Sequence, residues 1–110
     1  MKNGTMLRPG DLVLLQVQFV DRKEVKRRPA VVLYIEFDNV VVAGVTSNTR
    51  MHGIPLTIAE GAKKESIIKL NYVFTVAEQL ITKTFFRLTA EKRRIMYIQL
   101  HKKISGLLAE

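Results

Sequence analysis

The sequence predicts a single, mostly β domain, a small barrel or sandwich that ends in a C-terminal α-helix. Its 110 residues, 47% hydrophobic and 25% charged, suit one compact domain with a modest core. Between residues 11 and 88, short runs rich in β-branched and aromatic residues alternate with polar turns, as in small barrels and sandwiches. Helix signals gather after residue 88. We therefore expect one domain over residues 1–110, with a loose N-terminus at residues 1–8.

The expected strands follow from the pattern of side chains along the chain. Residues 11–19 alternate between two sets of side chains, which predicts a strand packed on one face and partly covered on the other. Continuous β-branched runs at residues 29–35 and 40–45 flank a polar turn with Asp38 and Asn39, which predicts an antiparallel hairpin. The remaining expected strands are residues 54–58, 66–72, 74–76 and 82–88.

The last expected element is a helix over residues 89–108. Thr89 can cap its start, Glu91 lies in the first turn, and Lys102 and Lys103 lie toward its end, as the helix dipole favours. A helical wheel places one apolar stripe toward the core, made of Met96, Tyr97, Leu100, Ile104, Leu107 and Leu108. Ile95 and Ile98 fall on the opposite side, where they are either tolerated exposed residues or part of a subunit contact.

Composition excludes several classes of protein. The chain has no cysteine, so disulfides and thiolate zinc sites are excluded, and with only two histidines we expect neither a metal site nor a cofactor. The longest apolar run, residues 30–35, is far shorter than the roughly 20 residues needed to cross a bilayer. The first residues lead into no apolar core of a signal peptide, so we expect a cytoplasmic protein with no membrane association.

The charge is strongly positive. Lysine and arginine outnumber acids by 18 to 10, a net charge of +8 that favours polyanionic partners such as nucleic acid or an acidic protein. Five of the seven residues at positions 22–28 are basic, and we expect them in a loop between two strands. From charge alone, a solvated run and a phosphate-binding segment are equally open.

Two β-runs end in polar residues that can hold a phosphate. They are RPAVVL at residues 28–33 and VAGVTS at residues 42–47, and as neighbouring strands they would bring Arg28 and Thr46 to one site. With PGDLV at residues 9–13, SII at residues 66–68 and FTV at residues 74–76, these segments resemble, in order over most of the chain, the PemK/MazF/Kid family of toxin endoribonucleases.

The resemblance implies an SH3-like barrel of the PemK/MazF/CcdB type that cuts single-stranded RNA without metal or cofactor, using the substrate's own 2′-hydroxyl. Arg28 and Thr46 fall on the family's catalytic pair. A guanidinium group offers a rigid fork of donors to two phosphate oxygens, and Thr46 can add a hydroxyl donor. Without the resemblance, a solvated Arg28 and a merely β-forming Thr46 would be the favoured interpretation.

Glu24 is the expected general base by the same resemblance. Several family members have a glutamate shortly before the Arg-Pro pair, and Glu24 precedes Arg28 by four positions. Basic neighbours should keep its carboxylate ionised, which is the form that a base requires. A surface acid that only offsets those neighbours is equally open. The segment also lacks the glycines and the Asp-Pro pair that usually follow the first strand in the family.

Further residues near these motifs are expected to bind RNA. They are Lys26, Arg27, Ser47, Arg50 and Lys69. The Kid-like branch has an arginine and an aspartate where this chain has Lys69 and Asn71. An amide does not exchange protons near neutral pH, so Asn71 cannot take over proton transfer, whereas Lys69 can still hold phosphate.

Three other residues have weaker signals. His52, in the expected loop after Thr46, could exchange protons at neutral pH, but an exposed loop histidine is the favoured interpretation. Phe74 is expected in the core. Tyr72 could lie in the core or stack on RNA bases.

The family resemblance also implies a homodimer that is neutralised by an acidic antitoxin, and the positive charge suits both RNA and such an antitoxin. The alternative function is a non-enzymatic module of the same fold that contacts DNA, RNA or a protein such as gyrase, as the structurally related CcdB toxins do. An enzyme needs Arg28 and Thr46 to converge on one phosphate, whereas a binding module needs only a basic surface.

Overall fold

The computed structural model describes residues 6–18 and 25–109, which form one antiparallel sheet and one long helix. The strands are β1 (Asp11–Gln18), β2 (Val25–Glu36), β3 (Asn39–Thr46), β4 (Ile54–Leu56), β5 (Ser66–Ala77) and β6 (Ile81–Arg87). The helix α1 spans Ala90–Ile104. Short 3-10 helices are η1 (Ile58–Glu60), η2 (Glu78–Leu80) and η3 (Ser105–Leu108).

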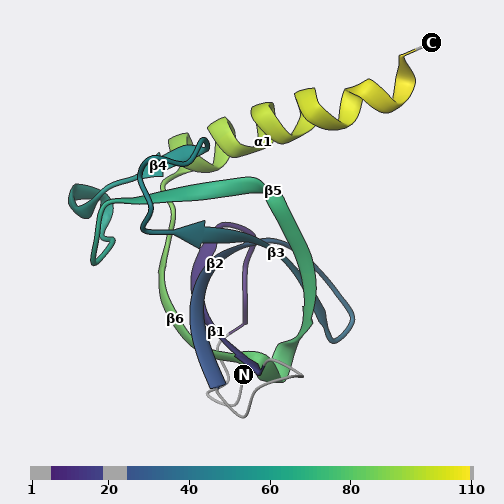
Figure 1. Cartoon of the computed structure of the whole chain (residues 1–110). Helices are drawn as coiled ribbons and strands as arrows, with labels where there is room; N and C mark the ends of the chain where they lie inside the picture. The colour runs from purple at the N-terminus through teal and green to yellow at the C-terminus, as the bar shows by residue number, and fades with distance from the viewer. Residues whose placement is uncertain (1–5, 19–24, 110) are drawn as a thin grey trace.

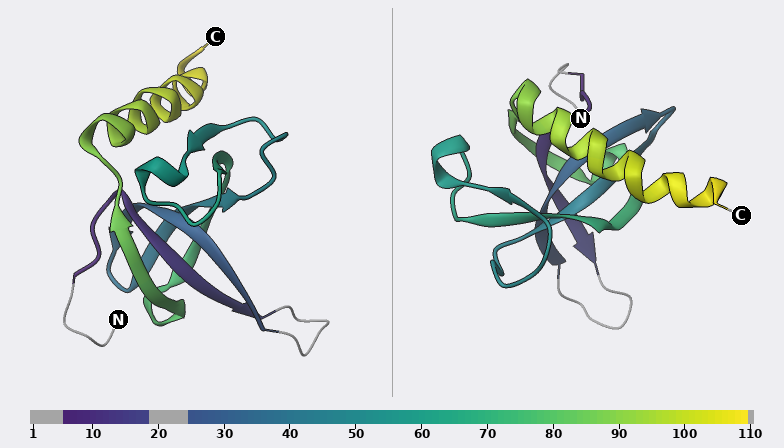
Figure 2. Two further views of the ribbon diagram at one scale, coloured as in Figure 1. Left: turned by 90° about the vertical axis from the view of Figure 1, so that its left-hand side faces the viewer. Right: turned by 90° about the horizontal axis from the view of Figure 1, so that it is seen from above.

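The six strands form a sheet in the order β4-β5-β3-β2-β1-β6, and every neighbouring pair is antiparallel. The sheet curls into a half-barrel, and α1 crosses its upper end beside β4 and β5 (Figure 1). The views in Figure 2 show that the C-terminal part of α1 projects away from the strands. The predicted mostly β fold with a C-terminal helix is thus confirmed. None of the helices in the described parts of the chain is long and apolar enough to cross a membrane.

Apolar side chains pack on both faces of the sheet. One cluster includes Leu12, Val31 and Leu56 and reaches Met96 of α1, so it fills the space between the sheet and the helix. The other cluster is built around Val13 and Leu15 and gathers residues from β1, β2, β3, β5 and β6, as a curled sheet permits on its concave face. Alternation along β1 supplies both clusters, since successive side chains of a strand point to opposite faces.

The core includes a residue that the sequence placed in a loose segment. Leu7, in the N-terminal stretch expected to be loose, is 7% exposed and joins the concave cluster. The backbone N–H of Arg8 donates to Asp11 Oδ2 at 2.8 Å and helps to fix this entry into β1. Residues 1–5 lie outside the described part of the chain.

The strands expected between residues 54 and 76 differ most from the structure. The predicted strand at residues 54–58 ends at Leu56, because Thr57 and Glu60 form a capping box that starts η1. The two strands expected at residues 66–72 and 74–76 are one strand, β5. Gly44 of β3 pairs with Lys69 while Ala43 pairs with Val73, so residues 70–72 form a bulge that bends β5 without breaking it.

The basic segment is also placed differently. β2 begins at Val25, so the basic residues at positions 26–28 lie on a strand rather than in the expected loop. They continue the pairing with β1, in which Arg28 lies opposite Leu15 and Lys26 opposite Val17. The ladder of hydrogen bonds to β1 therefore extends the strand beyond the apolar run from which it was predicted.

The predicted apolar stripe of the helix was largely wrong. Met96 is buried and Leu100 packs against the core, but Tyr97 and Ile104 are 68% and 52% exposed. Ile95, expected on the outer side, also packs against the core. The wheel failed because the core-facing side was misassigned, since Ile95 rather than Tyr97 packs against the core, and because the C-terminal part of α1 extends past the strands (Figure 1). Thr89 caps the helix as expected, since its hydroxyl oxygen accepts from the backbone N–H of Lys92 at 3.1 Å.

Candidate active site

The sheet opens between β2 and β3. Their paired register ends at Ala30 and Gly44, although β2 continues back to Val25 along β1 and β3 continues to Thr46 along β5. β2 stays paired with β1 and β3 stays paired with β5, so β2 and β3 separate from each other. Pro29, which has no backbone N–H to donate, and Gly44, which lies at the β5 bulge, stand at the point of separation. An open cavity of about 800 Å³ lies here.

Arg28 and Thr46 flank this cavity from its two strands. If the register of Ala30 with Gly44 were extended by two residues on each strand, Arg28 would lie opposite Thr46. Both residues line the cavity, together with Ser47. Arg28 is exposed and Thr46 is half-buried. The structure therefore brings to one cavity the two residues for which the sequence predicted a shared site.

The turn after β3 holds Thr46 in place. The hydroxyl oxygen of Thr46 accepts from the backbone N–H of Asn48 at 3.1 Å, and Asn48 Oδ1 accepts from the backbone N–H of Arg50 at 3.1 Å. A hydroxyl group has one hydrogen to donate besides its lone pairs. Because Thr46 uses a lone pair in this turn, its hydrogen can still be donated to a ligand in the cavity.

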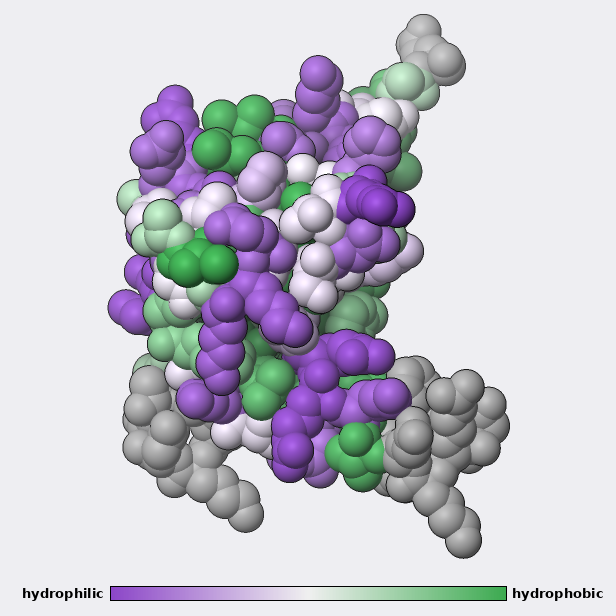
Figure 3. Space-filling model, turned by 60° about the vertical axis from the view of Figure 1, so that its left-hand side comes forward, coloured by the Kyte–Doolittle hydropathy of each residue, from purple (hydrophilic) through white to green (hydrophobic). Residues whose placement is uncertain are grey.

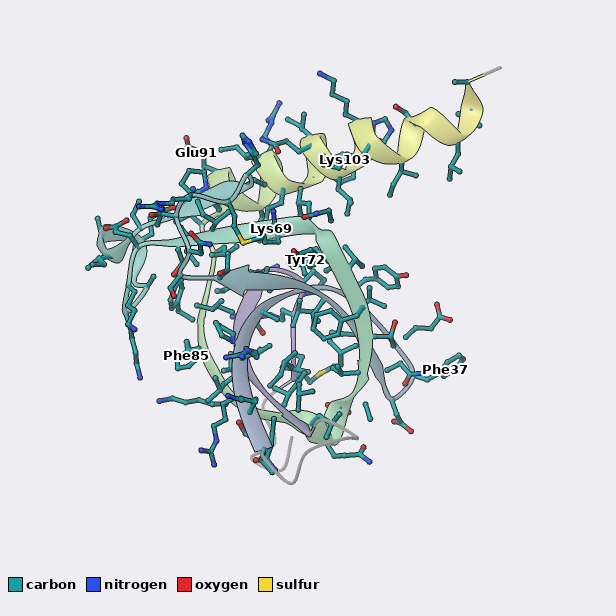
Figure 4. All side chains as sticks on the ribbon, in the orientation of Figure 1. Phe37, Lys69, Tyr72, Phe85, Glu91 and Lys103 are labelled. Atoms are coloured by element: carbon teal, nitrogen blue, oxygen red, sulfur yellow. The ribbon has the colours of Figure 1, made fainter. Side chains whose placement is uncertain are left out.

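Lys69 is a buried cation at the same cavity. It lies on β5 opposite Gly44 and is 6% exposed. Its Nζ donates to the backbone oxygen of His52 at 2.7 Å and stands 5.2 Å from the centre of the Tyr72 ring. No carboxylate among the described residues forms an ion pair with it. Figure 4 shows Lys69 and Tyr72 near the bend of β5 below α1.

Gly53 lets the β3–β4 loop approach β5 closely enough for this contact. A Cβ atom at Gly53 would lie 2.4 Å from Ile67 Cγ2 and 2.4 Å from the backbone oxygen of Ile68, which is closer than atoms can approach. A side chain at this position would therefore push the loop off β5 and move the carbonyl of His52 away from Lys69. His52 contributes this backbone carbonyl, while its side chain is exposed.

The rest of the cavity wall combines aromatic rings with lysines. Tyr72 is 50% and Phe74 is 40% exposed, so the expectation that Phe74 lies in the core was wrong. Further lining residues are Lys63, Lys64, Lys83, Phe85 and Phe86. Figure 3 shows, on the face turned toward the viewer, a band of hydrophilic side chains next to apolar ones. The combination suits a ligand with both negative charge and flat apolar surfaces.

Among the described residues, three of those expected to bind RNA do not line the cavity. Glu24, the expected base, lies outside the described residues. Ser47 and Lys69 line the cavity, whereas the other residues expected to bind RNA do not. Those are Lys26 and Arg27 on β2 and Arg50 in the turn after β3. Asn71 is exposed in the β5 bulge, outside the cavity wall.

An ion pair between Lys92 of α1 and Glu60 of η1 lies on the side of β4 that faces the helix. Lys92 Nζ lies 3.2 Å from Glu60 Oε2 and donates to the backbone oxygen of Pro55 at 2.6 Å. Burial alone would raise the pKa of the Glu60 carboxyl. The backbone N–H and hydroxyl of Thr57, each 2.9 Å from Glu60 Oε1, together with Lys92 outweigh burial and lower that pKa below its ordinary value. These contacts fasten η1 and β4 to the helix.

Arginines also gather where β1 and β6 meet α1. Arg87 Nε donates to the backbone oxygen of Pro9 and Arg93 Nε to that of Leu88, both at 3.1 Å. Desolvation, followed by the positive charges of Arg93 and Arg8, lowers the pKa of Arg87, which the nearby carboxylate of Asp11 opposes. None of these residues lines the cavity. Their hydrogen bonds tie the ends of the strands together.

The sequence did not predict that most of the lysine and aromatic residues of the cavity wall belong to one site. Lys63, Lys83 and Phe85 come from two segments that the sequence gives no reason to join. One signal was present for Lys69, because a lysine between Ile68 and Leu70 interrupts a strand that otherwise reads as buried. Among the described residues, no three side chains of the kinds that hold metal ions lie together.

Comparisons with known proteins agree on the fold. A family model described as PemK-like, MazF-like toxin of type II toxin-antitoxin system matches residues 8–103. The chain is similar to the MazF of a MazE-MazF structure from Deinococcus radiodurans, with a TM-score of 0.72, 16% identity and coverage of 88% of this chain and 94% of that one. No protein among those with curated functions matches the sequence.

Two mycobacterial structures are similarly close. The Mycobacterium tuberculosis toxin MazF-mt6 has a TM-score of 0.68 and 18% identity over 86% of this chain and 96% of its own. An endoribonuclease in complex with its cognate antitoxin from a mycobacterial species has a TM-score of 0.69 and 9% identity, with coverage of 88% of this chain and 91% of that one. At these identities the likeness establishes a shared fold.

Proposed function

The chain belongs to the PemK-like, MazF-like family of toxins of type II toxin-antitoxin systems, and we propose that it is an endoribonuclease that cuts single-stranded RNA at the cavity between β2 and β3. The observation that carries this proposal is the placement of Arg28 and Thr46 on two separating strands that line one cavity. A cationic fork and a hydroxyl donor are the groups that a reacting phosphate needs.

The proposed reaction uses the substrate's own 2′-hydroxyl. Its oxygen attacks the adjoining phosphorus, the bond from phosphorus to the 5′ oxygen breaks, and the products are a 2′,3′-cyclic phosphate and a free 5′-hydroxyl. One proton leaves the 2′-hydroxyl and one is delivered to the departing oxygen. Arg28 binds the phosphate oxygens whose negative charge grows in the transition state, and Thr46 donates its hydroxyl hydrogen to the same phosphate. Because the guanidinium supplies the positive charge, the reaction needs no metal ion.

We propose Glu24 as the general base, on the family pattern alone, since it lies outside the described residues. Glu24→Gln keeps the size of the side chain and removes its ability to take a proton. It should lower the cleavage rate by about a hundredfold or more while RNA still binds. An unchanged rate would assign the base to another group.

Lys69 adds to the proposed substrate site a positive charge that no carboxylate of residues 6–18 and 25–109 pairs with. Burying a cation without a carboxylate is unfavourable, so its retention suits a site that an anion completes. Ser47 lies beside Thr46 on the cavity wall. Lys26, Arg27 and Arg50 lie outside the cavity, and we assign them to phosphates farther along the RNA strand.

We further propose that an acidic antitoxin inhibits the protein by covering this basic surface. Two of the similar structures are of toxins solved together with their antitoxins, which supports a partner of this kind. RNA and an acidic peptide would use the same cations, so their binding should be competitive and should weaken as salt rises.

We also propose a homodimer, as the family pattern implies. The part of α1 that projects from the sheet leaves apolar side chains exposed, which suits a subunit contact. Tyr97, Ile98 and Ile104 are 68%, 52% and 52% exposed. Ile95 packs against the core, so it is no longer a candidate for this contact. Light scattering should give the mass of a dimer, and a monomer at micromolar concentration would reject this assembly.

The direct test of function is cleavage by the purified protein. A mixed-sequence single-stranded RNA is incubated with the protein in EDTA, and the cut ends are mapped and chemically identified. Cuts that carry cyclic phosphate and 5′-hydroxyl ends are expected. Arg28→Ala, purified in the same way, controls for contaminating nucleases. The absence of cuts, or equal cutting by Arg28→Ala, would reject the proposal.

A further inference from the structure

Phe85 occupies a bulge at the cavity wall. β1 pairs Leu12 with Phe86 and Val13 with Thr84, which leaves Phe85 as an extra residue in β6. Bulges are enriched next to active sites, where they redirect a side chain. Phe85 and Phe86 are adjacent in sequence, yet both line the cavity. The bulge therefore presents a second aromatic ring to the cavity, where a regular strand would turn it to the other face.

Two ammonium groups stand over this ring. Lys83 Nζ lies 5.0 Å and Lys63 Nζ 5.5 Å from the centre of the Phe85 ring. Lys83 belongs to β6, whereas Lys63 belongs to the segment between η1 and β5. Both lysines are exposed and Phe85 is half-buried. Phe85 also packs against the core cluster between the sheet and the helix, but a phenylalanine that served only the core would not have two cations over its ring.

A nucleotide matches this arrangement. An aromatic ring in a positively charged groove stacks on the flat face of any base, and lysines bind the phosphates on either side. Phe85 and the proposed cleavage residues line the same cavity, so the base would belong to a nucleotide near the cut. An acidic peptide could use the lysines but would leave the ring without a flat partner.

We propose that Phe85, Lys63 and Lys83 form a nucleotide subsite, in which one base of single-stranded RNA stacks on the Phe85 ring and the two lysines bind adjoining phosphates. On binding, an ammonium group leaves the ring for a phosphate, and the base takes its place. The inference deepens the proposed function, on which it rests, because it assigns a base-binding position to the same cavity.

The chain contains no tryptophan, which makes a sharp test possible. Phe85→Trp introduces a single tryptophan, which can be excited selectively over the tyrosines and whose emission is quenched when a base stacks on it. Phe37→Trp is the matched control, because Phe37 is 92% exposed in the turn between β2 and β3 and does not line the cavity. The probe is a short mixed-sequence 2′-O-methyl oligoribonucleotide, which cannot be cut through a 2′-hydroxyl. An abasic oligonucleotide of the same length supplies the phosphates without bases.

The proposal predicts that the base-bearing oligonucleotide quenches Phe85→Trp, that the abasic one does not, and that neither quenches Phe37→Trp. Equal quenching by both oligonucleotides would show that only the charges matter and would overturn the proposal. Absence of quenching, or equal quenching of Phe37→Trp, would overturn it as well.

A second pair of variants covers the case in which Phe85→Trp does not fold. By fluorescence anisotropy, Phe85→Leu should bind a labelled 2′-O-methyl oligonucleotide about tenfold more weakly than the unsubstituted protein, and Phe85→Tyr should restore binding. Binding of the labelled abasic oligonucleotide should be the same in all three. An equal loss for both oligonucleotides, or none, would contradict base stacking.

Cleavage assays separate this inference from the proposed function. Phe85→Leu should raise KM for RNA by about tenfold. Base-dependent quenching in a protein that cuts no RNA would retain the subsite and reject the nuclease. Conversely, normal cleavage by Phe85→Leu with an unchanged KM would retain the nuclease and reject the subsite.

Discussion

Lys69 of β5 and Lys92 of α1 both donate to backbone carbonyl groups in the segment around β4. Lys69 Nζ binds the oxygen of His52 at 2.7 Å and Lys92 Nζ that of Pro55 at 2.6 Å. Lys92 also has Glu60 Oε2 at 3.2 Å, whereas no carboxylate in the described part of the chain forms an ion pair with Lys69. The two lysines therefore make similar backbone contacts but differ in how their charge is balanced.

This difference separates a part of the molecule that holds β4 in place from a part that can bind an anion. A partly buried lysine beside a hydrogen-bonded carboxylate forms a neutral unit, which stabilises the fold. Burial of a lysine without such a partner has a cost in folding stability, which an anion bound beside it would offset. Lys69 lies at the cavity with Arg28 and Thr46, so the unbalanced charge is where the proposed substrate phosphate would lie.

The largest expected effect is at Arg28, the other cation of the proposed phosphate site. Arg28→Ala removes the group that stabilises the transition state, so the cleavage rate should fall by on the order of a hundredfold or more with the fold intact. Arg28→Lys should rescue poorly, because a single ammonium cannot replace the two-pronged contact. Rates are measured on mapped cuts, with circular dichroism as a check of folding. A fully active Arg28→Ala would place the site elsewhere.

Lys69→Met tests whether the lysine at the cavity binds the substrate. Methionine has a similar length and no charge, so binding of the 2′-O-methyl oligonucleotide should weaken by about tenfold. The slope of log affinity against log salt concentration should become shallower by the amount expected for about one lost phosphate contact. Thermal stability should change little, because the lost hydrogen bond is offset by removal of a buried charge. Anisotropy titrations at several salt concentrations measure both effects. Unchanged binding together with a large loss of stability would make Lys69 a structural residue like Lys92.

Lys92→Met is the matched variant on the other side of β4. It leaves the half-buried Glu60 carboxylate without its ion pair, so the free energy of unfolding should fall by about 1–2 kcal/mol. Oligonucleotide binding should be unaffected, because Lys92 does not line the cavity. Urea denaturation and the same anisotropy assay measure the two quantities. A loss of binding without a loss of stability would remove the distinction between the two lysines.

The Glu60 side of this ion pair predicts a dependence on pH. The pKa of Glu60 is lowered in the folded protein, so the unfolded chain takes up this proton first as the pH falls. The stability that Glu60 contributes is therefore fully present above its ordinary pKa of about 4.3 and is lost as the pH falls through the lowered folded value. Glu60→Gln should be less stable than the unsubstituted protein at pH 7, by about 1 kcal/mol. The difference should shrink below about pH 4 in urea denaturation.

The smallest expected effect concerns the cations outside the cavity. Arg27→Ala and Arg50→Ala each remove one exposed charge, so each should weaken RNA binding a few-fold at low salt and leave stability nearly unchanged. The effects should fade as salt rises, because exposed charges are screened. If either substitution matched the effect of Lys69→Met, burial at the cavity would not distinguish Lys69 from the surface cations.

How much of this arrangement could be predicted from the sequence depends on whether a feature is local. The β-branched runs and the capping residue Thr89 reveal the strands and the start of the helix. Polar residues at the ends of two adjacent strands drew attention to Arg28 and Thr46, but only the family resemblance favoured a shared site over a solvated arginine and a β-forming threonine. The separation of β2 from β3 is not local, because it depends on which neighbour each strand follows. The sequence therefore predicted the pair but not the cavity between them.

The failures have physical causes of the same kind. A helical wheel shows which side chains share a face, but it shows neither which face meets the sheet nor where the sheet ends, so Tyr97 and Ile104 were assigned to a core that they do not reach. The pattern around Phe85 reads as an ordinary strand, because a bulge is set by pairing with β1 rather than by the residues of β6. Lys69 was expected to bind phosphate, but its burial follows from the approach of the β3–β4 loop at Gly53, which the sequence does not reveal.

The most direct test of the central claim is a comparison of two RNA substrates that differ by one oxygen atom. Once a cut site has been mapped, the nucleotide on its 5′ side is replaced by its 2′-deoxy form, and both substrates are incubated with the protein in EDTA. If Arg28 and Thr46 assist attack by the substrate's own hydroxyl, the normal RNA is cut and the deoxy-substituted RNA is not. Cleavage of the deoxy-substituted RNA at the same bond would contradict the account.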